Sequence, residues 1–517
     1  MKRFVAHYAD KVIGVLSGFD RLLFRGTLKG LGYVAGMIMF LNVNHVLRKK
    51  FKEYVQRSTE RLKETSLAAA KEQGRPVVYL SSTKIDKEAE ARKIAERDHI
   101  KDGLICVLGC VEPCTTYRVF GDRSTNEAEL KSHWTRCLHL YHYMNDPVFG
   151  FMHVRLQTWL PYSAQVYING REWLARLMDR EGIRYERRDN CFPWIEDMDR
   201  AKELVQQQRS IRWERELDRV TRMANPSLKE LLGNFESEYR WSLWQSEWAT
   251  DVMFKSPKDL AAIYRPLVLH GITTFGSDDV MRFLGQKAHG LFQGEIVSDF
   301  RNRPEGICIH HRVGANSVKM YDKQGSILRV ETTIHDPAGI KVFRRKQGEP
   351  KGERAMLPMR KGIADLKRRT DVSQASNDRY LDALASADTT TAIGTLVQSV
   401  ARPVRDRKGR RFRALRAWDA EDLKLFRAIS RGEFAIRGLR NRDLQAHLFS
   451  CPPTNYEEGC RRTAKVSRVI RMLRAHGLLR KVPRDRLYRL TEKARDFLAA
   501  ILSVQDATPQ ALAKIRA

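Results

Sequence analysis

The stretch VSRVIRMLRAHGLLRKVPRDRLYRLTEKAR, residues 466–495, is the most informative part of this 517-residue chain. Its first half places apolar residues at i, i+3, i+4 and i+7, the spacing of a helix face that packs on a core. These residues are Val466, Val469, Ile470 and Leu473. Gly477 follows at the position of a helix C-cap. Two short strand-like runs around Pro-Arg-Asp come next, so the stretch predicts a helix, a hairpin and the start of another helix.

Further helices precede this stretch and complete a recognisable order. AEDLKLFRAIS, RNRDLQAHLF and the helix that contains Val466 give helix-helix-helix-hairpin-helix over residues 417–505. This order resembles the winged helix-turn-helix domain of MarR-like regulators. The resemblance implies a nucleic-acid-binding module whose third helix enters a groove and whose hairpin forms the wing.

The polar face of the predicted third helix supports nucleic-acid binding independently of the resemblance. An Arg- and Ser-bearing face opposite an apolar face suits insertion into a major groove, and basic wing residues suit phosphate contacts. The predicted contact residues are Arg461, Lys465, Ser467, Arg468 and Arg471 on the helix, and Arg480, Lys481, Arg484, Arg486 and Arg489 on the hairpin. Residues 401–517 hold 29 of the 93 Lys and Arg but only 12 of the 62 Asp and Glu. DNA is therefore the expected partner, with RNA as the alternative.

The composition of the whole chain restricts its class. The net charge is +31 and the hydrophobic fraction is 42%, which favours a globular protein that binds a polyanion. The apolar run at residues 31–43 is too short for a bilayer span, which needs about 20 residues, so no membrane association is expected. We find no leader pattern and no phosphate loop, and expect a cytoplasmic protein without nucleotide hydrolysis.

The rest of the chain predicts an α+β multidomain protein. We expect an N-terminal helical segment at 1–75, an α/β region at 76–190 with a β-α-β unit, and a central α+β region at 196–345 with an antiparallel meander. One long helix is predicted at 196–223. A basic linker at 345–358 and a helical connector at 359–400 lead to the winged helix. No internal repeat is visible.

The central region contains GANSVKMYDKQGSILRVETTIHD, which reads as two alternating strands. The pattern Tyr321-Asp322-Lys323 followed by Arg-Val-Glu331 resembles a hairpin of rolling-circle replication initiators of mobile elements. The resemblance implies DNA nicking with Tyr321 as the nucleophile and Glu331 as a catalytic metal ligand. His335 stands four residues after Glu331, which on one strand would share its face, so we predict it as a second ligand of Mg²⁺ or Mn²⁺. Many such initiators carry a metal motif in which two histidines flank one hydrophobic residue. This sequence has only the adjacent pair His310–His311, whose imidazoles cannot point to the same face of a regular strand.

Other clusters have structural or functional interpretations. Further carboxylates available to a metal in this half are Glu247, Asp251, Asp299 and Asp336. Three tryptophans at helical spacing, Trp241, Trp244 and Trp248, favour a core over a base-stacking platform. Cysteines at 106, 110 and 114 and a group at His133, Cys137, His139 and His142 favour buried strand positions, with a metal site as the alternative.

Two functions remain open from the sequence. One is an enzyme, a replication or mobilisation initiator that binds DNA through the winged helix and cuts it at the central sheet. The other is a non-enzymatic MarR-like regulator or RNA-binding protein, whose N-terminal half senses a ligand or pairs two subunits into a homo-oligomer.

Overall fold

The computed structural model describes the chain except for a set of short segments. These are residues 123–126, 274, 276, 286–295, 304–305, 347, 350–351, 386–392, 407–408, 431–438, 450, 483–485, 492, 495–496, 499 and 503–517.

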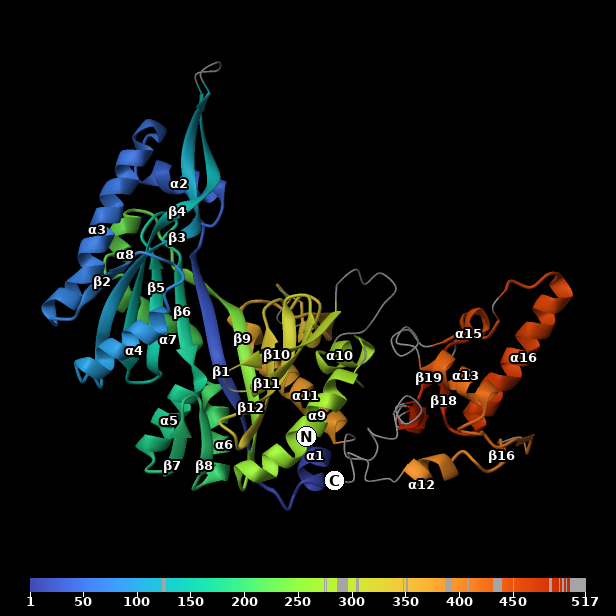
Figure 1. The fold of residues 1–517 in the computed structure, drawn as a ribbon. Coiled ribbons are helices and arrows are strands. Elements are labelled where there is room, and N and C mark those ends of the chain that lie inside the picture. Colours follow the sequence, from blue (N-terminus) through green and yellow to red (C-terminus); the bar gives the residue numbers. More distant parts are fainter. Residues whose placement is uncertain are drawn as a thin grey trace.

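Eleven strands of the described chain form one large sheet (Figure 1). All neighbouring strands are antiparallel except β2 and β3, which are parallel. In spatial order the strands are β10 (Ile296–Arg303), β11 (Gly306–Val313), β12 (Asn316–Lys323), β13 (Ile327–Ile334), β9 (Tyr239–Phe254), β1 (Val12–Leu28), β6 (Ala164–Asn169), β5 (Gly150–Gln157), β4 (Glu127–Asp146), β3 (Gly103–Asp122) and β2 (Val77–Leu80).

The sheet consists of two halves with the same strand order, although no repeat is visible in the sequence. In the N-terminal half, β1 is followed by helices and then by the meander β3-β4-β5-β6, whose last strand pairs with β1. In the C-terminal half, β9 is followed by helices and then by β10-β11-β12-β13, whose last strand pairs with β9. The two first strands, β1 and β9, pair antiparallel at the centre. The junction between the halves is therefore built by β13, β9, β1 and β6.

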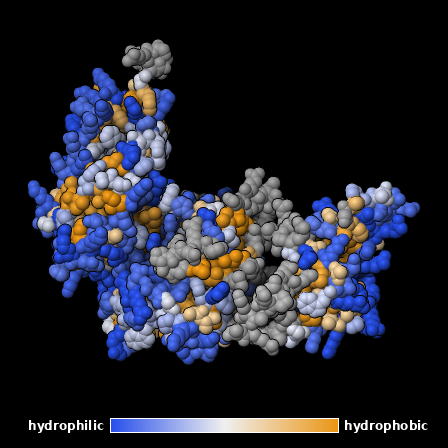
Figure 2. Space-filling view, in the orientation of Figure 1, coloured by the Kyte–Doolittle hydropathy of each residue, from blue (hydrophilic) through white to orange (hydrophobic). Residues whose placement is uncertain are grey.

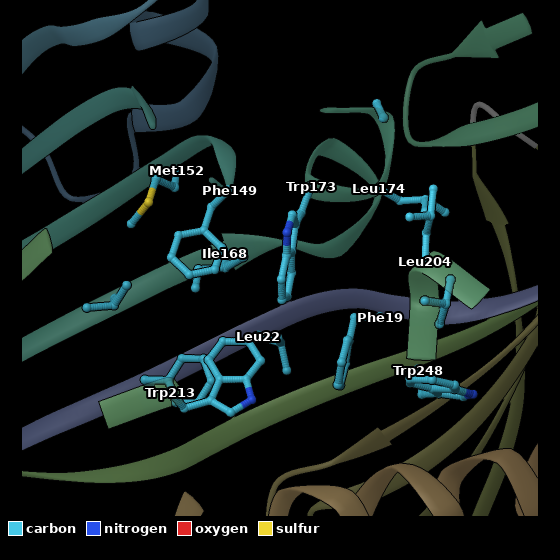
Figure 3. Packing of buried hydrophobic residues seen from close by; sticks show 14 of the residues in the cluster. Phe19, Leu22, Phe149, Met152, Ile168, Trp173, Leu174, Leu204, Trp213 and Trp248 are labelled. Carbon is cyan, nitrogen blue, oxygen red and sulfur yellow. The ribbon is translucent and has the colours of Figure 1, made fainter. Parts of the chain in front are cut away.

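Helices cover the sheet and supply its cores. Those of the first half are α1 (Lys2–His7), α2 (Val34–Val43), α3 (Phe51–Glu72), α4 (Lys87–Arg97) and α5 (Gly170–Arg180). The helices that follow along the chain are α6 (Met198–Gln208), α7 (Trp213–Ala224), α8 (Leu228–Leu232), α9 (Pro257–Thr273), α10 (Ser277–Phe283) and α11 (Leu366–Leu384). Figure 3 shows the core under α5, α6 and α7, where Phe19 lies beside Trp248 and the rings of Trp173 and Trp213 meet edge to face.

A separate group of elements forms the C-terminal unit (Figure 1). It contains α12 (Ile393–Gln398), β16 (Val404–Arg405), β17 (Arg411–Phe412), α13 (Ala420–Ile429), α15 (Asn441–Leu448), α16 (Tyr456–Ala475), β18 (Leu479–Lys481) and β19 (Tyr488–Leu490). The predicted apolar face of α16 is confirmed, because Val466, Ile470 and Leu473 are buried and Val469 packs against the same core. β18 and β19 form the expected antiparallel hairpin. The buried residues Ala494, Phe497 and Ile501 join this core from the segment where the last helix was expected.

The structure confirms the β-α-β unit β2-α4-β3 and the meander β10-β11-β12-β13. It corrects other predictions. Residues 12–28, expected to be helical, form the central strand β1, in which every second residue from Leu16 to Leu28 is buried and most of the residues between them are only partly buried. The helix expected over 196–223 is two helices, α6 and α7.

The expected linker at 345–358 is also partly regular. Its end forms β15 (Arg354–Pro358), which pairs with β14 (Lys341–Arg345) outside the large sheet. The segment that contains the three tryptophans is the strand β9, so their spacing does not reflect a helix. Trp241 and Trp248 are buried in the core, as predicted, whereas Trp244 is only half-buried and packs against His335.

Candidate functional site

A cleft of about 600 Å³ lies at the junction of the two halves of the sheet. Its wall is formed by charged, amide and hydroxyl-bearing side chains. The residues that line it are Asp20, Arg21, Glu88, Arg92, Tyr167, Asn169, Glu172, Arg187, Asp189, Asn190, Glu247, Lys319, Tyr321, Lys323, Arg329 and Glu331. Both predicted catalytic residues, Tyr321 and Glu331, are among them.

Three carboxylates meet in this cleft. Asp20, Glu247 and Glu331 each offer an oxygen, and these oxygens lie within 4.8 Å of one another. The side chains come from β1, β9 and β13, which are adjacent in the sheet although the residues lie up to 311 positions apart in the chain. All three residues are buried. Because carboxylate oxygens are preferred ligands of Mg²⁺ and Mn²⁺, the group is suited to hold a divalent cation.

A β-bulge brings Asp20 into this group. Phe19 pairs with Trp248 and Leu22 pairs with Ser246, so two residues of β1, Asp20 and Arg21, oppose the single residue Glu247 of β9. A bulge of this kind redirects a side chain that a regular strand would place on the other face. The Nε of Arg21 lies 3.6 Å from a carboxylate oxygen of Glu247.

The crowding of carboxylates changes their proton affinity. Burial, together with the nearby charge of Glu331, raises the pKa of Glu247 to about 7. Burial also raises the pKa of Asp20, although Arg329 opposes this effect. Burial acts in the same direction on Glu331, but Lys319 and Arg329 outweigh it and lower its pKa. The raised pKa values of Glu247 and Asp20 mean that a divalent cation bound between the carboxylates would displace protons from them.

Tyr321 is hydrogen-bonded to this cluster. Its hydroxyl donates to Oε2 of Glu331 at 3.0 Å, while the Nζ of Lys319 donates to Oε1 of the same carboxylate at 3.0 Å. Lys319 lies directly opposite Glu331 across β12 and β13, and Tyr321 is two residues further along the same face. Burial and the Glu331 charge raise the pKa of Tyr321 well above its usual value. The phenol is therefore neutral at neutral pH.

Buried arginines hold the cluster in place. Arg329 contacts Asp251 through Nε at 2.6 Å and Asp20 through Nη1 at 3.1 Å. Arg171 of α5 reaches the other oxygen of Asp251 at 2.9 Å. All four side chains are almost inaccessible to solvent. Such a network fixes Asp20 relative to β13, which carries Glu331.

His335, the second predicted metal ligand, lies outside this cluster. β13 ends at Ile334, so the strand alternation that would align His335 with Glu331 stops one residue short. Its ring instead packs edge-on against Trp244, with centroids 5.1 Å apart, and its backbone N–H donates to Asn316. Asp20 and Glu247, rather than His335, lie beside Glu331 in the structure. Glu247 was a candidate from the sequence, whereas Asp20 was missed because its segment was read as helical.

The predicted nucleic-acid contacts lie on α16 and the β18–β19 hairpin. Eight of the basic residues are exposed: Arg461, Lys465, Arg468, Arg471, Arg480, Lys481, Arg486 and Arg489. Ser467 is half-buried and accepts a hydrogen bond from Asn441 at 2.8 Å, so it positions α15 against α16. Arg484 lies outside the described residues. Figure 2 shows that hydrophilic residues predominate over the α16 end of the molecule.

Comparisons of the chain with protein-family models, with curated protein sequences and with solved structures found no match. Among the described residues, no helix combines the length and the apolar character needed to cross a bilayer.

Proposed function

We propose that this protein is a metal-dependent DNA-nicking enzyme of the replication- or mobilisation-initiator type, which binds DNA through its C-terminal unit. The observation that carries the proposal is the hydrogen bond between the Tyr321 hydroxyl and Glu331, a member of a three-carboxylate cluster, inside a cleft. A phenol, a basic group and a cation site within one cleft are the components that transesterification of a phosphodiester requires.

Each residue of the cluster has a role in this reaction. Asp20, Glu247 and Glu331 would hold a divalent cation, which supplies positive charge to polarise the scissile phosphate. The Tyr321 oxygen attacks phosphorus, the P–O3′ bond breaks, and a phosphotyrosine and a free 3′-hydroxyl result. Oε2 of Glu331 accepts the phenol proton, since it already accepts that hydrogen bond, and the departing 3′ oxygen takes up a proton from solvent. Lys319 and Arg21 stabilise the charge that develops on the phosphate.

In this proposal the C-terminal unit supplies most of the affinity for DNA. Its helix-helix-helix-hairpin order and the exposed basic residues of α16 are consistent with a winged helix whose third helix contacts base edges. Basic residues on the hairpin would contact phosphates and carry much of the salt dependence of binding. Recognition and cutting are thus assigned to different parts of the chain.

The test is incubation of the full chain with supercoiled and single-stranded DNA and Mn²⁺ or Mg²⁺, followed by a denaturing gel. We expect nicked DNA and a covalent protein–DNA adduct that require the metal. Tyr321→Phe removes only the hydroxyl and should abolish both products while DNA binding persists. Tyr239→Phe is a matched control, because its buried hydroxyl donates to Tyr162 outside the cleft. DNA binding without nicking by the wild-type protein would favour the non-enzymatic regulator.

A further inference from the structure

A second cluster of metal-binding side chains lies in the long hairpin formed by β3 and β4. Each strand has 20 residues, and Figure 1 shows the pair rising beyond the neighbouring strands. Glu112 lies directly opposite Cys137, Cys110 opposite His139, and Cys114 opposite Thr135. Paired residues and every second residue along a strand share one face of the sheet. Cys114, Cys137 and His139 therefore face the same side.

These three side chains are close together and withdrawn from solvent. The two sulfur atoms are 3.1 Å apart, and each donor atom of the group lies within 4.8 Å of the others. The exposed fractions are 6% for Cys114, 8% for Cys137 and 1% for His139. The cluster is separate from the carboxylates of the cleft, since none of the three lines it.

The hydrogen bonding of His139 leaves one ring nitrogen available as a ligand. Its Nδ1 lies 3.1 Å from the carbonyl oxygen of Cys137, an acceptor, so Nδ1 carries the hydrogen. Nε2 then has a free lone pair, and it is buried without a hydrogen-bond partner in the described structure. A neutral imidazole whose other nitrogen is fixed by a backbone carbonyl is the usual form of a metal-bound histidine.

We propose that Cys114, Cys137 and His139 bind a zinc ion that joins β3 to β4. Two thiolates and one imidazole form a ligand set that zinc prefers. Glu112, although opposite Cys137, is already engaged by Arg155 and Tyr141, so the fourth position is assigned to water. Tetrahedral zinc with bonds of about 2.3 Å holds two sulfurs about 3.8 Å apart, so binding requires the pair to open by several tenths of an ångström. Both thiol protons leave to solvent when the thiolates bind.

The first experiment measures metal in the full chain. Cys451 and Cys460 are exposed, so both are changed to Ser to prevent adventitious binding. After dialysis against zinc and then buffer, elemental analysis should find about one zinc per chain. Cys114→Ser, Cys137→Ser and His139→Gln should each lower this value at least tenfold. The buried Cys191→Ser, which lies outside the cluster, should leave it unchanged.

Cobalt provides a readout that does not depend on the variants folding. Replacement of zinc by Co²⁺ should produce a sulfur-to-cobalt charge-transfer band and the intense visible absorption of a tetrahedral site. Zinc should displace both signals. Absence of the charge-transfer band, retention of zinc by all three variants, or a Cys114–Cys137 disulfide in non-reducing peptide mass spectra of the purified protein would each overturn the proposal.

Discussion

The two halves of the large sheet have the same strand order but line the central cleft with different chemistry. In the C-terminal half, Lys319 lies opposite Glu331 and forms an ion pair with it. In the N-terminal half, His153 lies opposite Tyr167, and their rings stack with centroids 5.1 Å apart. Burial lowers the pKa of His153 to about 3, so this pair is uncharged at neutral pH. The comparison indicates that β12 and β13 supply Tyr321 and its hydrogen-bond acceptor Glu331, whereas β1 and β9 supply the other two carboxylates of the cluster.

The largest expected effect concerns the buried arginine that ties the halves together. Arg329→Leu leaves Asp20 without its buried cation and Asp251 with only Arg171. Because breaking a buried ion pair typically costs about 3–5 kcal/mol, the free energy of unfolding should fall by this amount. Urea denaturation of the variant and the wild type measures the change. The exposed Arg184→Leu, whose partner Glu196 is also solvent-accessible, should change it far less, because water screens an exposed ion pair. A similar loss in both variants would contradict the role assigned to Arg329.

The next prediction compares the cleft residues of the two halves directly. Glu331→Gln removes a cation ligand and the acceptor of the Tyr321 proton, so the rate of nicking should fall by about 10²-fold or more. Tyr167→Phe changes the other half of the same cleft and should leave adduct formation with Tyr321 intact. Rates are measured under single-turnover conditions with Mn²⁺. The reverse result would place the chemistry in the N-terminal half.

The sequence predicted the β12–β13 hairpin and its residues and offered Glu247 as a candidate carboxylate, but it did not identify Asp20 or the grouping of the three carboxylates. Alternation over residues 316–334 is clear, and it placed Tyr321 near Glu331 correctly. Asp20 was not predicted because the alternating burial of β1 is not matched by alternating apolar residues: its buried positions include Gly18, Asp20 and Gly26. The cluster also depends on the pairing of β13, β9 and β1, and neither that pairing nor the bulge beside Glu247 leaves a local signal.

A smaller effect is expected in the C-terminal unit. Arg468→Ala/Arg471→Ala removes two exposed cations of α16 and should weaken specific DNA binding by a few kcal/mol, as one base contact contributes about 1–3 kcal/mol. Arg57→Ala/Arg97→Ala is the matched control on exposed helices of the sheet region. Fluorescence anisotropy at several salt concentrations measures both. Equal losses would show that contacts outside the C-terminal unit carry the affinity.

The smallest predicted effect is a pH dependence caused by Glu247. Its pKa rises from about 4.5 in the unfolded chain to about 7 in the fold, so ionisation destabilises the protein as pH increases through this window. Glu247→Gln stays neutral, and its stability relative to the wild type should therefore increase between pH 5 and pH 8 by roughly 1–3 kcal/mol. Thermal melting without added metal measures this. A constant difference across pH would refute the raised pKa.

The central claim is that Tyr321 attacks the phosphodiester in the cleft, and the most direct measurement is the site of covalent attachment. The full chain is incubated with a single-stranded oligonucleotide and Mn²⁺, the DNA is digested to a short remnant, and the tryptic peptides are sequenced by mass spectrometry. The account predicts a nucleotide phosphate on the Tyr321 peptide and none on the Tyr167 peptide. Attachment to Tyr167 or to a residue outside the cleft, or nicked DNA with no modified peptide, would contradict it.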